Sequence, residues 1–150
     1  MATTTNPSPN IQQAVPFFLV TDIETSLRYY TQGLGFAMSN SWIDEGKLQW
    51  CWLQNGNAAL MLQELRKEGV VTHQPEGKLR EGVSICFICR DALAIYDAII
   101  AKGIVAAEPF VGNNMWVVSV TDPDGYRLDF ESMTDVPEGT LLSEWRKTAA

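Results

Sequence analysis

The strongest constraint on the fold of this chain is an internal repeat. Asp22 and Asp91 each follow a short apolar segment and open an amphipathic helix, and they lie 69 residues apart in a chain of 150. In both places one predicted strand precedes the helix and three follow it. A period of this size indicates two copies of one β-α-β-β-β unit rather than a solenoid of short repeats. The chain length agrees with one domain that contains both copies.

The elements of each copy follow from apolar periodicity and turn residues. The first copy has a strand, a helix and three strands over 15–20, 22–32, 36–43, 48–53 and 58–64. The second copy repeats this order over 83–89, 91–102, 104–111, 115–120 and 126–131. The modules therefore cover about 13–65 and 82–133. A flexible arm, a polar linker and a C-terminal extension with a short amphipathic turn are expected over 1–12, 66–81 and 134–150.

Charge and apolar content limit the partners of the chain. Eighteen acidic residues against eleven basic ones give a net charge of −7 and a pI near 4.6, so a basic nucleic-acid-binding face is not expected. No apolar run approaches the roughly 20 residues of a membrane span, and the N-terminus lacks the basic and apolar regions of a signal peptide. Three cysteines, an odd and small number, suit a reducing compartment. We therefore expect a cytoplasmic protein without nucleic-acid or membrane partners.

Two of the cysteines form a C-x-x-C pattern, which redox and zinc sites also use. Cys86 and Cys89 lie in the predicted strand over 83–89, where residues three apart point to opposite faces. We therefore expect structural thiols.

Three motifs resemble one known family in their sequence and order. Val-Thr-Asp at 20–22, with Gly-Leu-Gly-Phe at 33–36, is similar to the opening of vicinal oxygen chelate proteins, the superfamily of glyoxalase I, bleomycin-resistance proteins and extradiol dioxygenases. Leu-Met-Leu-Gln at 60–63 resembles a stretch of bleomycin-resistance proteins, and 122–131 resembles the family's closing strand. The resemblance covers about 13–133. It implies an α+β fold, in which two βαβββ modules form a curled eight-stranded mixed sheet around a concave cleft, and a homodimer.

The resemblance also implies four metal-ligand positions in that cleft. In metal-dependent members they usually hold His, Glu or Gln, His and Glu. Here they fall on Val15, Gln63, Ser84 and Asp129. Both imidazoles are lost, which leaves too few donors for a typical site. The only histidine, His73, lies in the polar linker and is expected to be solvated. We expect no cofactor, with a divalent metal as the lesser alternative.

Strand parity predicts which side chains line the cleft. With Asn55 and Gly56 as a two-residue hairpin loop, Leu53 pairs with Ala58 and Trp50 with Met61. This pairing gives one apolar face for the helices, formed by Cys51, Leu53, Leu60 and Leu62. The other face is the cleft side, with the predicted ligand-binding residues Trp50, Trp52, Met61 and Gln63. Parity and the resemblance add Phe17, Ser84, Asp129 and Glu131, while Trp42 and Trp116 are assigned to the rim.

These residues leave three functions open. The first is binding or sequestration of a small, partly aromatic molecule, with a cationic one as the expected case, because indoles and carboxylates both attract cations. The second is an enzyme of lyase, isomerase or dioxygenase type, which uses Asp129 or Glu131 as acid or base. The third is a scaffold whose cleft is closed by its own side chains, with Trp50 and Trp52 as core residues.

Overall fold

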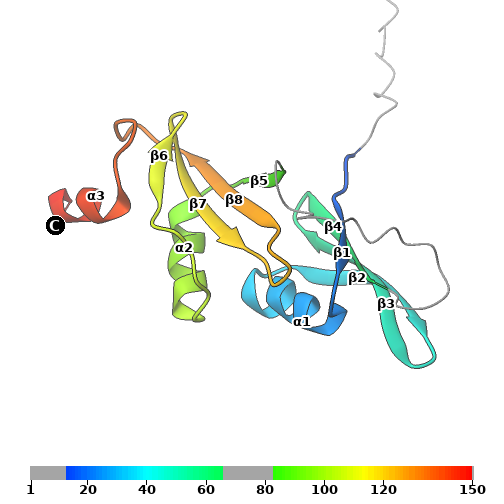
Figure 1. Ribbon diagram of the computed structural model, residues 1–150. Coiled ribbons are helices and arrows are strands. Elements are labelled where there is room, and N and C mark those ends of the chain that lie inside the picture. The colour runs from blue at the N-terminus through cyan, green and yellow to red at the C-terminus, as the bar shows by residue number, and fades with distance from the viewer. Residues whose placement is uncertain (1–12, 66–82, 150) are drawn as a thin grey trace, which may run out of the picture.

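Eight strands form two four-stranded sheets in the computed structural model, one sheet from each module (Figure 1). The structure describes residues 13–65 and 83–149. The predicted arm over 1–12, the linker over 66–81 and His73 lie outside the described residues. The first module consists of β1 (Phe17–Val20), α1 (Ile23–Arg28), the π-helical turn η1 (Tyr29–Gly33), β2 (Ala37–Asp44), β3 (Lys47–Asn55) and β4 (Ala58–Glu64). The second consists of β5 (Ser84–Ile88), α2 (Ala92–Ala101), β6 (Phe110–Gly112), β7 (Met115–Thr121) and β8 (Arg127–Met133), and α3 (Leu142–Thr148) follows it.

The two modules share one topology. Strand order is β1-β4-β3-β2 in the first sheet and β5-β8-β7-β6 in the second. In each sheet the first strand runs parallel to the last one, and the other neighbours are antiparallel. This confirms the predicted α+β fold of two βαβββ modules. None of the helices in the described ranges is long and apolar enough to cross a membrane.

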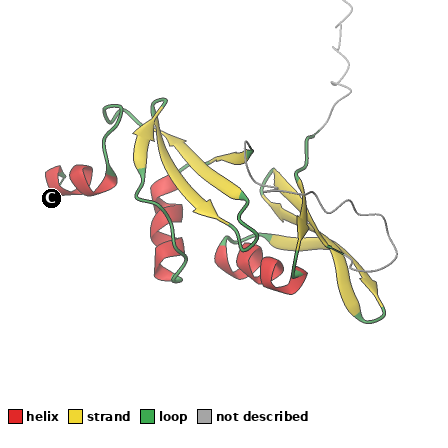
Figure 2. Cartoon of the chain, viewed as in Figure 1, coloured by secondary structure: helices red, strands yellow, loops and turns green. Residues whose placement is uncertain are grey.

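Both module helices begin where the sequence predicts. The carboxylate of Asp22 accepts a hydrogen bond from Thr25 N at 3.1 Å, and that of Asp91 accepts one from Ala94 N at 3.0 Å. Each aspartate is thus an N-cap that satisfies a backbone donor of the first turn. The ends of α2 and η1 lie in contact, because Lys102 Nζ donates to the carbonyl of Gly33 at 3.1 Å. The ribbon shows both helices on one side of the sheets (Figure 2).

The predicted hairpin pairing is wrong by two residues. Asn55 pairs with Ala58 and Trp50 pairs with Gln63. The loop consists of Gly56 and the residue after it, and Gly56 takes the positive φ of 57° that a glycine adopts without strain. A shift of two residues leaves every side chain on its predicted face, because side chains alternate with period two.

The predicted strand over 104–111 is shorter in the structure. Only β6 forms, preceded by an isolated bridge between Ala106 and Val120. Pro109 has no N–H to donate to a ladder. The outer edge of β6 is covered by the C-terminal extension, since Val111 N donates to the carbonyl of Thr140 at 2.9 Å.

The closing turn of the second module fastens onto the first module. Asp124 accepts hydrogen bonds from the backbone and hydroxyl of Thr21 at 3.2 and 2.9 Å. Asp122 accepts one from the hydroxyl of Tyr30 at 2.8 Å, and both residues are buried. The ring of Tyr126 stacks on that of Phe18, with centroids 4.2 Å apart. The two modules therefore share one core.

Candidate functional site

The helix-free face of the first sheet carries a row of large side chains, which we call the aromatic face. Its helix side is closed, since Cys51, Leu53, Leu60 and Leu62 are fully buried. The alternate residues are only half-buried. Trp50 pairs with Gln63, and Trp52 pairs with Met61. The members of the aromatic face are Phe17, Trp42, Trp50, Trp52, Met61 and Gln63.

The indoles of this face lie outside the core. Trp52 is half-buried, and its Nε1 donates to Gln54 Oε1 at 2.8 Å, so the polar end of the ring is satisfied within its own strand. Trp42 on the edge strand is 46% exposed. Trp116, which the sequence assigned to the rim, is instead a core residue that is 4% exposed and packs edge-on against Trp145 of α3. That contact depends on the C-terminal extension, which the repeat does not include.

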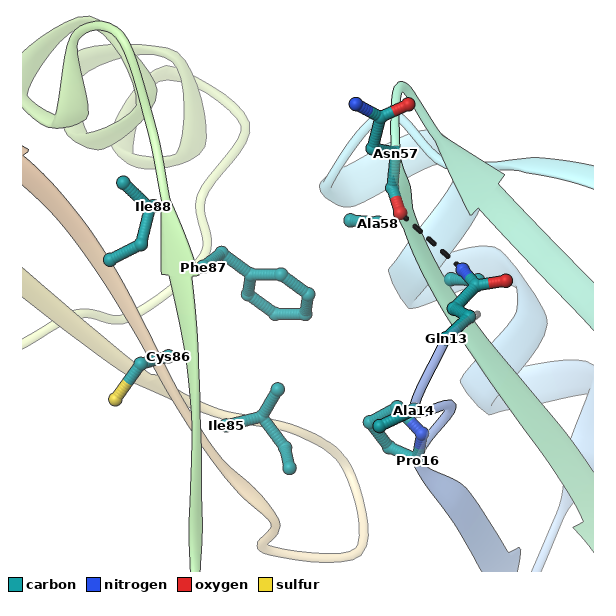
Figure 3. A pocket seen from close by; sticks show the side chains of 10 residues that line it. Gln13, Ala14, Pro16, Asn57, Ala58, Ile85, Cys86, Phe87 and Ile88 are labelled. Carbon is teal, nitrogen blue, oxygen red and sulfur yellow. Dashed lines mark hydrogen bonds between the residues drawn. The ribbon is translucent and has the colours of Figure 1, made fainter. Parts of the chain in front are cut away.

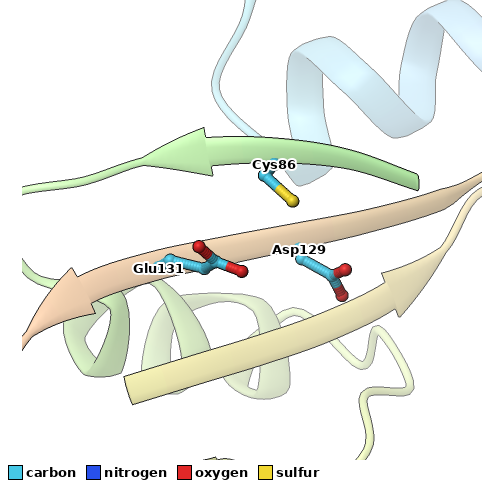
Figure 4. A group of neighbouring side chains, drawn as sticks. All are labelled: Cys86, Asp129 and Glu131. Atoms are coloured by element: carbon cyan, nitrogen blue, oxygen red, sulfur yellow. The ribbon is translucent and has the colours of Figure 1, made fainter. Parts of the chain in front are cut away.

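The second sheet carries an acidic cluster on its helix-free face (Figure 4). The thiol of Cys86 and the carboxylate oxygens of Asp129 and Glu131 all lie within 4.8 Å of one another. Cys86 pairs with Asp129 across the parallel β5–β8 ladder. We call Cys86, Asp129 and Glu131 the acidic cluster.

Asp129 is held in place by two donors. It is 5% exposed, and its Oδ1 accepts hydrogen bonds from Ser119 Oγ at 2.5 Å and from Arg127 Nε at 3.1 Å. The carboxylate is thus buried but partly neutralised by the guanidinium. Ser84 is exposed and pairs with Arg127, two residues along the ladder from the acidic cluster.

Cys86 is not among the predicted site residues, because the C-x-x-C spacing points only to a pairing with Cys89. The signal that would have found it is parity with Ser84, which places both on the same face of the strand. Burial, followed by the charges of Glu131 and Asp129, raises the pKa of the Cys86 thiol. The protonated thiol is therefore the favoured form.

The four residues that the resemblance assigns to metal-ligand positions offer few donors. Val15 offers no donor, and Gln63 and Ser84 offer a neutral amide and a neutral hydroxyl. Asp129 Oδ1 already accepts hydrogen bonds from two donors. The acidic cluster offers a different set of one sulfur and two carboxylates, and an ion there would have to displace the thiol proton.

A pocket of about 270 Å³ lies between the two modules (Figure 3). Ile85 and Phe87 point from β5 toward the start of β1, whereas Cys86 points away. Across the pocket, Gln13 Nε2 lies 3.5 Å from the carbonyl oxygen of Asn57. Its lining residues are Gln13, Ala14, Pro16, Asn57, Ala58, Ala59, Ile85, Cys86, Phe87 and Ile88.

The structure thus divides the predicted ligand-binding residues into two groups. Five lie on the aromatic face, namely Phe17, Trp50, Trp52, Met61 and Gln63. Three lie on the second sheet, namely Ser84, Asp129 and Glu131. None of the eight lines the inter-module pocket, which reaches the acidic cluster only through Cys86.

Comparison with known proteins identifies a family and a fold. A family model described as the Glyoxalase/Bleomycin resistance protein/Dioxygenase superfamily matches residues 11–130. Comparison with curated proteins found no match.

Several solved structures have a similar fold. TioX from Micromonospora sp. ML1 has 14% identity and a TM-score of 0.63, with 84% of this chain and 99% of that chain covered. TnmS3, an antibiotic binding protein from Streptomyces sp. CB03234, has 18% identity and a TM-score of 0.61, with 82% and 98% covered. Virulence protein STM3117 from Salmonella typhimurium has 21% identity and a TM-score of 0.59, with 83% and 98% covered. At these identities the similarity shows the fold alone.

Proposed function

The chain belongs to the glyoxalase/bleomycin resistance protein/dioxygenase superfamily, and from this premise we propose that it binds or sequesters a small, partly aromatic molecule without using a metal. The ligand lies against the aromatic face and is cationic where it meets the carboxylates of the second sheet. The fold hosts both enzymes and binders, so the side chains determine which function a member has.

One observation carries the proposal: Trp50 and Trp52 are half-buried on the side of their strand that faces away from the helices. A core role would place them with Cys51 and Leu53, which are fully buried. Flat indole surface that remains accessible can stack on an aromatic ligand. A cation over an indole gains roughly 0.5–2 kcal/mol, depending on desolvation.

The carboxylates and the overall charge support a cationic ligand. Asp129 and Glu131 lie on one face of β8, and the chain carries a net charge of −7. A negative chain attracts cations over long range and raises their association rate. Among the similar structures, TnmS3 is an antibiotic binding protein, a precedent for antibiotic binding by this fold.

The proposal includes a metal-free, cytoplasmic homodimer. Metal-free binding is supported by the weak donor set at the family positions. The three cysteines are free thiols, which suits a reducing compartment. The dimer is supported by β2, an edge strand whose eight residues are all exposed, including Met38, Trp42 and Ile43. Pairing with a second copy would cover such an edge.

Tryptophan fluorescence provides the test. We expect N-methylquinolinium to quench the intrinsic fluorescence saturably, and neutral quinoline to do so more weakly. Trp52→Ala should weaken N-methylquinolinium binding by about 1–2 kcal/mol through lost stacking and cation–π contact. Asp129→Asn should reduce the preference for the cation, whereas Asp135→Asn, at an exposed carboxylate beyond β8, should leave it unchanged. Equal affinity of the Trp52→Ala variant and the parent chain would contradict the proposal.

The acidic cluster favours one second candidate, an enzyme in which Asp129 or Glu131 transfers a proton. Its buried aspartate and adjoining carboxylate are groups that general acid–base catalysis uses. Turnover of a bound aromatic compound that is lost in Asp129→Asn and Glu131→Gln would favour this candidate. A chain that binds neither quinoline compound would instead favour a scaffold with a closed cleft.

A further inference from the structure

A second groove lies in the second module and shares no lining residue with the inter-module pocket. It has a volume of about 460 Å³ and runs between the segment 105–110 and β7. Its strand residues come from β7 and from the starts of β6 and β8, whereas the inter-module pocket is lined in this module from β5. Four of its eight lining residues are apolar, namely Val105, Ala107, Phe110 and Val120.

One end of this groove is polar, and hydrogen bonds hold its side chains in place. Ser119 and Arg127 both line it. The guanidinium of Arg127 donates to buried Asp129 through Nε at 3.1 Å and to Ser119 Oγ through Nη2 at 3.4 Å. These two contacts orient the guanidinium. The Arg127 side chain is still 57% exposed, and within the described residues its Nη1 donates no hydrogen bond to a protein group.

The other charged residue of the groove is turned elsewhere. Glu108 accepts a hydrogen bond from Ser143 N at 2.9 Å. Ser143 lines a neighbouring groove beside α3, together with Leu142 and Arg146. The carboxylate of Glu108 is therefore held on the α3 side, and Arg127 is the cation that lines the polar end.

From this arrangement we propose that the groove is a second binding site, for a small molecule that carries a carboxylate on an apolar body. The carboxylate bonds to the free edge of the Arg127 guanidinium, whose planar fork matches two carboxylate oxygens. The apolar body lies against Val105 and Phe110, which are both exposed in the free chain. This site lies apart from the aromatic face, although Arg127 is paired with Asp129 of the acidic cluster, and it takes a ligand of opposite charge.

The test uses two probes of the same shape, 4-phenylbutyrate and its neutral amide 4-phenylbutanamide, titrated into the full chain by isothermal calorimetry. We expect the carboxylate to bind about tenfold more tightly, as for one hydrogen bond to a charged group. Arg127→Gln should abolish that preference. Equal affinity for the two probes in the parent chain, or an unchanged preference in Arg127→Gln, would overturn the proposal.

A second variant leaves the Arg127–Asp129 pair intact. Val105 is 87% exposed at the groove, so Val105→Trp should obstruct the groove and weaken both probes at least fivefold. The matched control is Val83→Trp, at an exposed valine outside the groove, which should bind both probes normally. Equal binding by Val105→Trp and Val83→Trp would place the ligand elsewhere. Trp52→Ala should leave 4-phenylbutyrate binding unchanged, so failure here is distinct from failure on the aromatic face.

Discussion

The contact between Tyr30 and Asp122 gives a direct measure of how strongly the modules are joined. Replacing Tyr30 by Phe removes only the hydroxyl, which donates to Asp122 Oδ2 at 2.8 Å. Both residues are buried, so water cannot replace the lost donor. Hydrogen bonds to charged groups contribute roughly 1.5–3 kcal/mol, and burial favours the upper part of this range. We therefore expect Tyr30→Phe to lower the free energy of unfolding by about 2–3 kcal/mol at neutral pH.

The effect should depend on pH in a defined direction. Burial raises the pKa of Asp122 above its ordinary value of 3.8, and the hydrogen bond from Tyr30 opposes that rise. A group with a raised pKa in the folded state stabilises the fold fully below its unfolded-state pKa, and loses this contribution as pH rises through the folded-state pKa. Tyr30 offsets part of the loss. Tyr30→Phe should therefore cost more stability near pH 7.5 than near pH 3.8.

Urea unfolding followed by circular dichroism provides the assay, with the neighbouring tyrosine as the control. The hydroxyl of Tyr29 donates to the carbonyl of Thr121 at 3.4 Å from a more exposed position. Tyr29→Phe should cost less than about 1 kcal/mol. For a chain of this size the Tyr30 effect corresponds to a fall in melting temperature of roughly 5–10 °C. Equal effects of the two substitutions, or a Tyr30→Phe cost that is larger at acid pH, would refute the reasoning.

Three further predictions concern the acidic cluster and the assembly. Glu131→Gln should increase the rate of Cys86 alkylation by iodoacetamide at pH 8 by up to about fivefold, because it removes a nearby negative charge that raises the thiol pKa. Mass spectrometry after limited reaction measures this rate, and an unchanged or lower rate would contradict the prediction. Elemental analysis of chain purified without chelator should find less than about 0.1 zinc, iron, nickel or manganese per chain; a stoichiometric ion that is lost in Asp129→Asn would contradict this expectation, which follows from the donor sets. Light scattering at micromolar concentration should give twice the chain mass of 16.7 kDa, whereas Trp42→Lys on the exposed β2 edge should shift the mass toward the monomer; a monomeric parent chain would refute the predicted dimer.

Local patterns in the sequence predicted the elements and their faces. The two helix-opening aspartates act as N-caps, because a cap depends only on residues a few positions away. The hairpin at Asn55 and Gly56 placed Trp50 and Trp52 on the face away from the helices, although the exact pairing was two residues off. Strand parity tolerates an even shift, so this prediction did not require the correct loop.

Only the tertiary structure decided which distant residues meet. Cys86 lies beside Asp129 and Glu131 because β5 pairs in parallel with β8, about 40 residues later in the chain. The residues of β5 alone do not specify which strand it pairs with. Trp116 is buried because α3 brings Trp145 onto it, and the repeat does not include α3. Periodicity determines which way a side chain points, whereas long-range packing determines what it meets. The sequence therefore predicted aromatic and acidic side chains on the side of the strands away from the helices, and the fold decided that Arg127, which is paired with Asp129, would line a groove.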